Sequence, residues 1–306
     1  MSLTSKIVER RPGVLLYGLA PPKRDTGPAD LERITAQQVA RLEALQVDGL
    51  IIYDLQDEAE RIATPRPFPF LPTIDPLSYA AEHLGRLAVP KIVYRCVSHD
   101  SAEDLAGWLG RAGSESPLRV LVGAPSRRTP AALPLSGALE LARRQAPGVI
   151  IGGIAIAERH ARGGAEHQRL LAKTNAGCRF FVTQAVYDIT ATKSLLSDYR
   201  LEAQRHHQEP VPIILTLSPC GSEKTLRFMQ WLGIAFPRWL ENELCHAPDP
   251  LETSLRLCER IFADAWEYAR DKGIPMGVNI ESVSARKAEI EASIELARRV
   301  RAIMHR

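Results

Sequence analysis

The residues with the clearest chemical potential lie at the end of a short apolar run. Residues 180–182 are Phe-Phe-Val, the polar pair Thr183-Gln184 follows directly, and Tyr187 lies in the turn beyond it. A glutamine amide carries both hydrogen-bond donors and an acceptor, which suits the edge of a flat heterocycle such as a pteridine. Gln184 is therefore a candidate ligand-binding residue. The alternative is that Gln184 only caps the end of a strand.

Polar side chains also follow other strand-length apolar runs. They are Tyr94 and Arg95, then Gly123 with Ser126 and Arg127, then Glu158, Ser218, Asn279 and Glu281. Arginines suit carboxylates or phosphates in a substrate, and carboxyl groups can transfer protons. If the runs are parallel strands of one barrel, their carboxyl ends meet and these residues share one site. No Ser-His-Asp set or nucleophile elbow is visible in the sequence.

The elements that must position these residues alternate along the whole chain. The predicted strands are 14–19, 50–55, 92–96, 119–122, 149–155, 179–183, 213–217 and 276–280. Helical patterns cover 29–45, 76–87, 102–111, 135–144, 165–175, 190–203 and 223–232, followed by 237–244, 250–272 and 286–304. This order predicts an α/β fold over residues 1–306, a single eight-stranded parallel (β/α)8 TIM barrel with extra helices after strand seven. A doubly wound open sheet is the alternative, although no GxGxxG follows the first strand.

Composition narrows the classes of protein and partner. The chain has 306 residues, 45% of them hydrophobic, and a net charge of +3, which indicates a soluble globular protein without an electrostatic case for nucleic acid. Apolar runs are too short to span a membrane, and residues 1–11 lack the apolar core of a signal peptide. Five cysteines without a CxxC are typical of a reduced, cytoplasmic protein. Amphipathic helices around 231–239 and Trp266 could form a contact in a homo-oligomer.

No metal site is predicted. His160, Glu166 and His167 are close in sequence, but their spacing does not set a ligand pair on one helical face. We therefore expect these three residues to be solvated surface residues.

Two segments resemble the methylenetetrahydrofolate reductase family. They are Lys-Thr-Asn-Ala-Gly at 173–177 and Thr-Gln-Ala-Val-Tyr-Asp at 183–188, with weaker similarity in Ala-Pro-Pro at 20–22 and Gly-Ile-Pro at 273–275. Residues 122–125 and 231–232 are more similar to the short branch of that family that works without bound flavin. The similarity runs from residue 18 to residue 301 and implies an eight-stranded barrel.

The resemblance also implies an activity and a set of site residues. The activity is reduction of 5,10-methylenetetrahydrofolate to 5-methyltetrahydrofolate with NAD(P)H, directly or through FAD, or the reverse reaction. In the family, the glutamine matching Gln184 contacts the pterin ring, and the lysine matching Lys173 lies in the flavin-phosphate region. We expect the folate to contact Gln184, Tyr187, Arg95, Ser218 and Asn279, and a cofactor to contact Lys173, Tyr94, Gly123, Ser126 and Arg127.

One departure from the family concerns its proton donor. The family's acid falls at Gly18, which cannot donate a proton. Glu281 is the best-placed substitute, so Glu281 and Gln184 are the candidate catalytic residues; Glu58 and Glu158 are weaker candidates for the acid. The alternative role of Glu281 is a salt bridge to Arg95 or Arg127.

Other departures concern the cofactor. Family positions that contact flavin fall at Tyr94, Ser126 and Ala172 in this sequence, so the case for FAD is weak. Three functions stay open: a reductase of this type, a folate-binding barrel protein or methyltransferase partner without reductase activity, and a barrel enzyme for another carboxylated small molecule.

Overall fold

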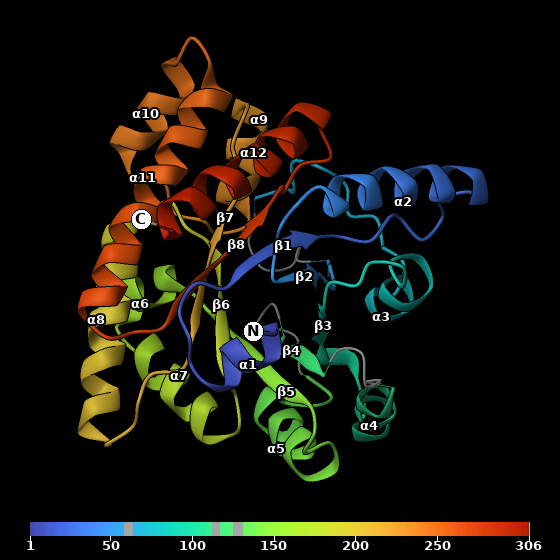
Figure 1. The fold of residues 1–306 in the computed structure, drawn as a ribbon, viewed down its shortest axis with the longest axis vertical. Coiled ribbons are helices and arrows are strands. Elements are labelled where there is room, and N and C mark those ends of the chain that lie inside the picture. The colour runs from blue at the N-terminus through green and yellow to red at the C-terminus, as the bar shows by residue number, and fades with distance from the viewer. Residues whose placement is uncertain (58–63, 112–116, 125–130, 306) are drawn as a thin grey trace.

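The strands form a closed barrel. The computed structural model describes residues 1–57, 64–111, 117–124 and 131–305. Its strands are β1 Leu15–Leu19, β2 Gly49–Ile52, β3 Lys91–Cys96, β4 Leu118–Val122, β5 Ile150–Ala155, β6 Phe180–Ala185, β7 Ile213–Leu217 and β8 Met276–Glu281. Each pairs in parallel with the next in sequence, and β8 closes on β1 (Figure 1). The predicted eight-stranded parallel barrel is confirmed.

Helices surround the strands (Figure 1). They are α1 Leu3–Val8, α2 Pro28–Glu43, α3 Pro76–Ser78, α4 Ala102–Gly110, α5 Leu135–Gln145, α6 Ala157–Gly163, α7 Glu166–Asn175, α8 Ile189–Arg205, α9 Glu223–Trp231, α10 Arg238–His246, α11 Pro250–Asp271 and α12 Lys287–Met304. The extra helices predicted after strand seven are α10 and α11. No helix of the described ranges is both long enough and apolar enough to cross a membrane.

Three helical segments differ from the sequence prediction. The helix expected at 76–87 is α3 followed by a π-helical turn, Tyr79–His83. Helices α1 and α6 were not predicted, because six or seven residues are too few for helical periodicity to show. Helix α1 packs into the interior of the barrel: Leu3 and Ile7 are buried in the same cluster as the inward-facing strand residues.

Side chains alternate between two cores because successive residues of a strand point to opposite faces. Inward residues such as Leu16, Ile51 and Val182 form a core inside the barrel. Outward residues such as Leu15 and Phe181 form a larger core beneath the helices. The same alternation continues to the carboxyl ends of the strands, where it decides which polar side chains face the barrel mouth.

Candidate functional site

The space beside Gly18 is bounded by three side chains. Gly18 pairs in register with Glu281 of β8 and with Ile51 of β2. Tyr53, two residues beyond Ile51, approaches Gly18 so closely that a Cβ added there would lie 2.8 Å from Tyr53 Cε2. The same atom would lie 3.1 Å from Asn279 Oδ1. Gly18 is therefore flanked by Tyr53, Asn279 and Glu281.

These three side chains form a polar group, the Tyr53–Asn279–Glu281 network. Asn279 Nδ2 donates to Tyr53 Oη over 2.9 Å. The Glu281 carboxyl group lies near both, and Tyr53 and Asn279 each act to lower its pKa. Tyr53 was not predicted as a site residue, since the sequence shows it only as part of a predicted strand. Tyr53 lies two residues after Ile51, which faces the barrel interior, and alternate residues of a strand face the same side. This alternation could have identified Tyr53 as a residue that faces the mouth.

Burial dominates the electrostatics of Glu281. Burial raises the pKa of Glu281 from 4.5 to about 7, and Tyr53 and Asn279 act in the opposite direction. Burial also raises the pKa of Tyr53 well above its usual 10.0, and the nearby Glu281 carboxylate adds to this. Glu281 can therefore hold or release a proton near neutral pH, whereas the phenol stays protonated.

Two buried polar atoms of the mouth have no hydrogen-bond partner within the described ranges. They are Tyr94 Oη and Asn279 Oδ1. The Tyr94 ring meets the edge of the Tyr53 ring at a centroid distance of 4.9 Å, and Tyr94 is only 5% exposed. Buried polar atoms normally have partners. A ligand with polar ring edges would supply them.

Gln184 lies near the carboxyl end of β6, where the pairing of β6 with β7 shifts register between Val182 and Ala185. It lies two residues after the inward-facing Val182, and its Nε2 atom donates to the Leu232 carbonyl oxygen over 2.6 Å. Leu232 is the residue that ends α9, so the connection after α9 reaches the Gln184 amide. A ligand that uses this amide must share that hydrogen bond or displace the connection.

Two predicted substrate residues lie behind the mouth. Tyr187 is 1% exposed in the outer core, and its ring stacks on Phe236 at 4.2 Å. Its hydroxyl donates to the Ser218 carbonyl oxygen over 2.7 Å and contacts Ser254 Oγ. Ser218 is fully buried, and its Oγ accepts a hydrogen bond from the Val283 backbone amide, which joins the ends of β7 and β8. Both residues hold the wall of the site together.

Arg95 is engaged in an ion pair. Its Nε and Nη2 atoms donate to the two carboxylate oxygens of Asp100 over 2.8 and 2.6 Å. Arg95 thus pairs with Asp100 and, at 3.7 Å, with Asp75. The sequence left open an ion pair between Glu281 and Arg95. In the structure, the ion-pair partners of Arg95 are Asp100 and Asp75.

The residues assigned to a cofactor are dispersed. Lys173 donates to the Ile154 carbonyl oxygen over 2.8 Å and lies over the ring of Phe181, an outer-core residue; burial lowers the pKa of Lys173. Gly123 follows β4, and a Cβ added there would lie 3.4 Å from the Cβ of Leu135 in α5. Ser126, Arg127 and the weaker candidate Glu58 lie outside the described residues.

We expected His160, Glu166 and His167, on α6 and α7, to be solvated surface residues, and this is wrong for two of them. His160 is 5% exposed and Glu166 is fully buried. Glu166 accepts hydrogen bonds from the Ile156 amide and from Arg169. The error has a physical cause: the unpredicted helix α6 packs against α8, so the side chain of His160 on α6 meets other helices and not solvent. Glu158, also on α6, is likewise buried, where it accepts from the Ala235 amide.

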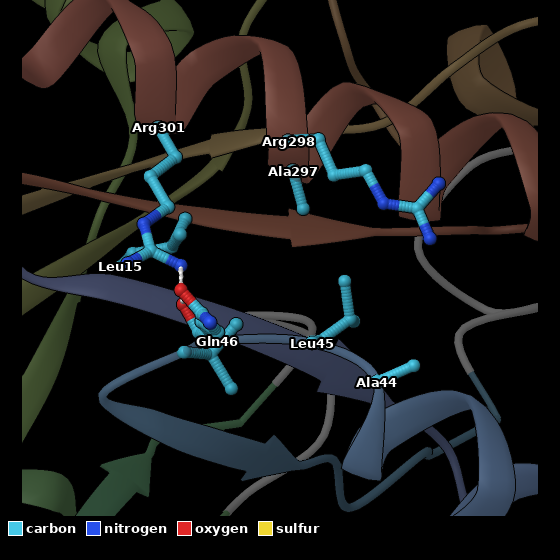
Figure 2. Close-up of a pocket in the computed structure, with 8 residues that line it drawn as sticks. Leu15, Ala44, Leu45, Gln46, Ala297, Arg298 and Arg301 are labelled. Atoms are coloured by element: carbon cyan, nitrogen blue, oxygen red, sulfur yellow. Dashed lines mark hydrogen bonds between the residues drawn. The ribbon is translucent and has the colours of Figure 1, made fainter.

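Two cavities lie away from the mouth. One of about 230 Å³ sits at the amino end of β1, where Arg301 of α12 donates to Gln46 across an opening lined by Leu15 and Leu45 (Figure 2). Another, of about 610 Å³, lies along α10 and α11. Neither is lined by a predicted site residue.

The fold and the mouth define the class of protein: a (β/α)8 barrel with ionisable and amide side chains gathered where such barrels bind their ligands. No protein-family model and no curated protein matches the chain. A solved structure of an uncharacterized protein from Clostridium thermocellum is 42% identical over 99% of this chain and 100% of its own, with a TM-score of 0.88. This chain belongs to the same family as that protein, which binds two copies of 5-methyl-5,6,7,8-tetrahydrofolic acid.

More distant structures carry no functional argument. A GH113 β-1,4-mannanase is 10% identical with a TM-score of 0.49, covering 95% of this chain and 98% of its own. Dihydropteroate synthase from Thermus thermophilus, in complex with 4-aminobenzoate, is 13% identical with a TM-score of 0.45, covering 96% of this chain and 95% of its own.

Proposed function

We propose that this protein binds a reduced folate of the 5-methyltetrahydrofolate type at the carboxyl end of its barrel. The observation that carries the proposal is the 42% identity, over 99% of the chain, to a protein that binds this compound. The resemblance of residues 183–188 to the methylenetetrahydrofolate reductase family supports it independently, since the glutamine matching Gln184 contacts the pterin ring there.

The chemistry of the mouth suits a pterin. One edge of the ring carries an amino group and a ring N–H beside a carbonyl oxygen, so it needs both acceptors and donors. Gln184 offers both kinds of group. Asn279 Oδ1 and the Glu281 carboxyl group are further acceptors, and the Tyr94 hydroxyl is a further donor or acceptor. These groups, on the barrel strands β3, β6 and β8, could together hold the ring by its polar edges.

A second candidate function is reduction of the one-carbon unit on the folate. It is favoured by the register that sets Glu281 opposite Gly18, the position of the family's acid. Breaking or forming a bond between the folate nitrogen and the one-carbon group requires a proton to move at that nitrogen. Glu281, with a pKa of about 7, is suited to donate or accept it. NAD(P)H would supply the hydride; the placement of Lys173 gives no support to FAD.

The proposal is tested by titrating the purified protein with 5-methyltetrahydrofolate in a calorimeter. Gln184→Ala should weaken binding about tenfold or more, because it leaves polar edges of a buried ring unpaired. Gln168→Ala, at a glutamine on the outer helix α7, is the matched control and should bind like the wild type. Absence of binding to the wild type would overturn the proposal, and unchanged affinity of Gln184→Ala would remove Gln184 from the site.

The reductase function is tested separately, by following NAD(P)H oxidation with 5,10-methylenetetrahydrofolate. Glu281→Gln should keep folate binding and lose turnover, since the amide keeps the shape of the side chain but cannot deliver a proton. Folate binding by the wild type without turnover would exclude the reductase and leave the binding function intact.

A further inference from the structure

Outside the barrel mouth, three metal-ligating side chains meet on three different helices. His160 belongs to α6, His167 to α7 and Asp198 to α8. One ligand atom from each lies within 4.8 Å of the other two. Figure 1 shows these helices grouped on one side of the barrel, and α8 packs against both α6 and α7. The cluster therefore joins α8 to two helices that precede it in the chain, and Asp198 comes 38 positions after His160.

The geometry is close to that of a metal site. His160 Nε2 lies 3.0 Å from Asp198 Oδ2. The two imidazole rings meet edge to face at a centroid distance of 5.2 Å. Around a tetrahedral zinc ion, with Zn–N distances of about 2.0–2.1 Å, ligand atoms lie roughly 3.3 Å apart. Small rotations of the three side chains would bring their ligand atoms from within 4.8 Å of one another to the separation that one zinc ion requires.

An ordinary ion pair does not account for the whole cluster. The His160–Asp198 contact uses one ring nitrogen, and His160 is 5% exposed. The Nδ1 atoms of both His160 and His167 are buried without a hydrogen-bond partner among the residues that the structure describes. Buried polar atoms without partners are costly. Coordination through Nδ1 of His167 would give that atom a partner, while His160 and Asp198 would coordinate through the Nε2 and Oδ2 atoms that lie 3.0 Å apart.

We propose that His160, His167 and Asp198 bind one divalent transition-metal ion of the zinc class. Two imidazoles and a carboxylate are a ligand set that zinc accepts, with water in the fourth position. The ion would cross-link α6, α7 and α8. It would thereby stabilise α6, whose Glu158 holds the Ala235 amide in the segment after α9. This site is separate from the proposed folate site and does not depend on it.

The test uses the full chain without an affinity tag, because a histidine tag binds the same metals. After treatment with a chelator, the wild type should bind one Zn²⁺ per chain in calorimetry, and Co²⁺ should produce the visible absorption of a low-coordinate site. Zn²⁺ should also raise the thermal midpoint, since it binds only the folded site.

The variants are His167→Ala on α7 and Asp198→Asn on α8, and each should weaken Zn²⁺ binding at least tenfold. His206→Ala is the control, because His206 is 55% exposed just beyond the end of α8. Far-ultraviolet circular dichroism verifies that each variant is folded. Absence of stoichiometric binding to the wild type, or equal affinity in the wild type and in both folded variants, would overturn the proposal.

Discussion

Replacing Glu281 by glutamine should change how the stability of the protein depends on pH. Burial raises the pKa of this carboxyl group from 4.5 to about 7 in the folded protein. Between these two pH values the folded state keeps a proton that the unfolded state releases. The contribution of Glu281 to stability is therefore fully present below 4.5 and is lost as the pH rises through 7.

The magnitude follows from the two pKa values. Each pKa unit corresponds to about 1.36 kcal/mol, so the total is about 3 kcal/mol, of which about 2.5 kcal/mol falls between about pH 5 and about pH 8. The glutamine amide of the variant does not titrate. The difference in free energy of unfolding, variant minus wild type, should therefore rise by about 2.5 kcal/mol over that interval.

The assay is urea denaturation of both proteins at several pH values between about 5 and 8. Glu291→Gln is the matched control on α12, because that side chain is 59% exposed and pairs with the exposed Lys287 at 3.7 Å. Its pH dependence should run parallel to that of the wild type. A constant difference between wild type and Glu281→Gln across the interval would refute the raised pKa, and with it the role of Glu281 as a proton donor near neutrality.

Two further predictions concern the walls of the site. Tyr187→Phe should lower the free energy of unfolding, measured by urea denaturation, by about 1–2 kcal/mol, because the Ser218 carbonyl loses its buried donor. Folate affinity, measured by calorimetry, should stay unchanged. A large loss of affinity would instead place Tyr187 in the binding surface. Gly18→Ala should lower the free energy of unfolding by about 1–3 kcal/mol. The new methyl carbon would lie only 2.8 Å from Tyr53 Cε2, so the Tyr53 ring would have to move. Gly148→Ala, where no described atom lies within 4 Å of the added Cβ, is the control and should stay within about 0.5 kcal/mol of the wild type; equal effects of the two substitutions would contradict the tight contact beside Gly18.

Much of the fold could be predicted because its signals are local. The run that becomes β7 has the same bounds in prediction and structure, Ile213–Leu217, and the other strands differ by a few residues at their ends. Strand-length apolar runs separated by amphipathic segments leave few ways to bury both faces of a parallel sheet. Helix α6 was missed, since two turns packed between other helices carry no amphipathic pattern of their own.

The candidate site was predictable only in part. Gln184 could be named as a candidate because a polar residue directly after an apolar run is a local feature, and Glu281 because it ends the last strand. Tyr187 looked equivalent to Gln184 in the sequence, yet the structure directs it into the outer core. Whether a side chain near a strand end faces the mouth or the helices depends on its parity and on where the strand turns, and the sequence does not show that turn.

The sequence by itself determined the barrel, the order of its strands and the strand ends that carry amide and carboxyl groups, because these depend on residue type and spacing along the chain. Only the tertiary structure decided that β8 meets β1 with Glu281 beside Gly18, that Tyr53 fills the space between them, and that His160, His167 and Asp198 converge. Closure of the barrel and packing of its helices set these contacts. Both join residues that are distant in the chain, whose register is set by the whole fold and not by any one segment.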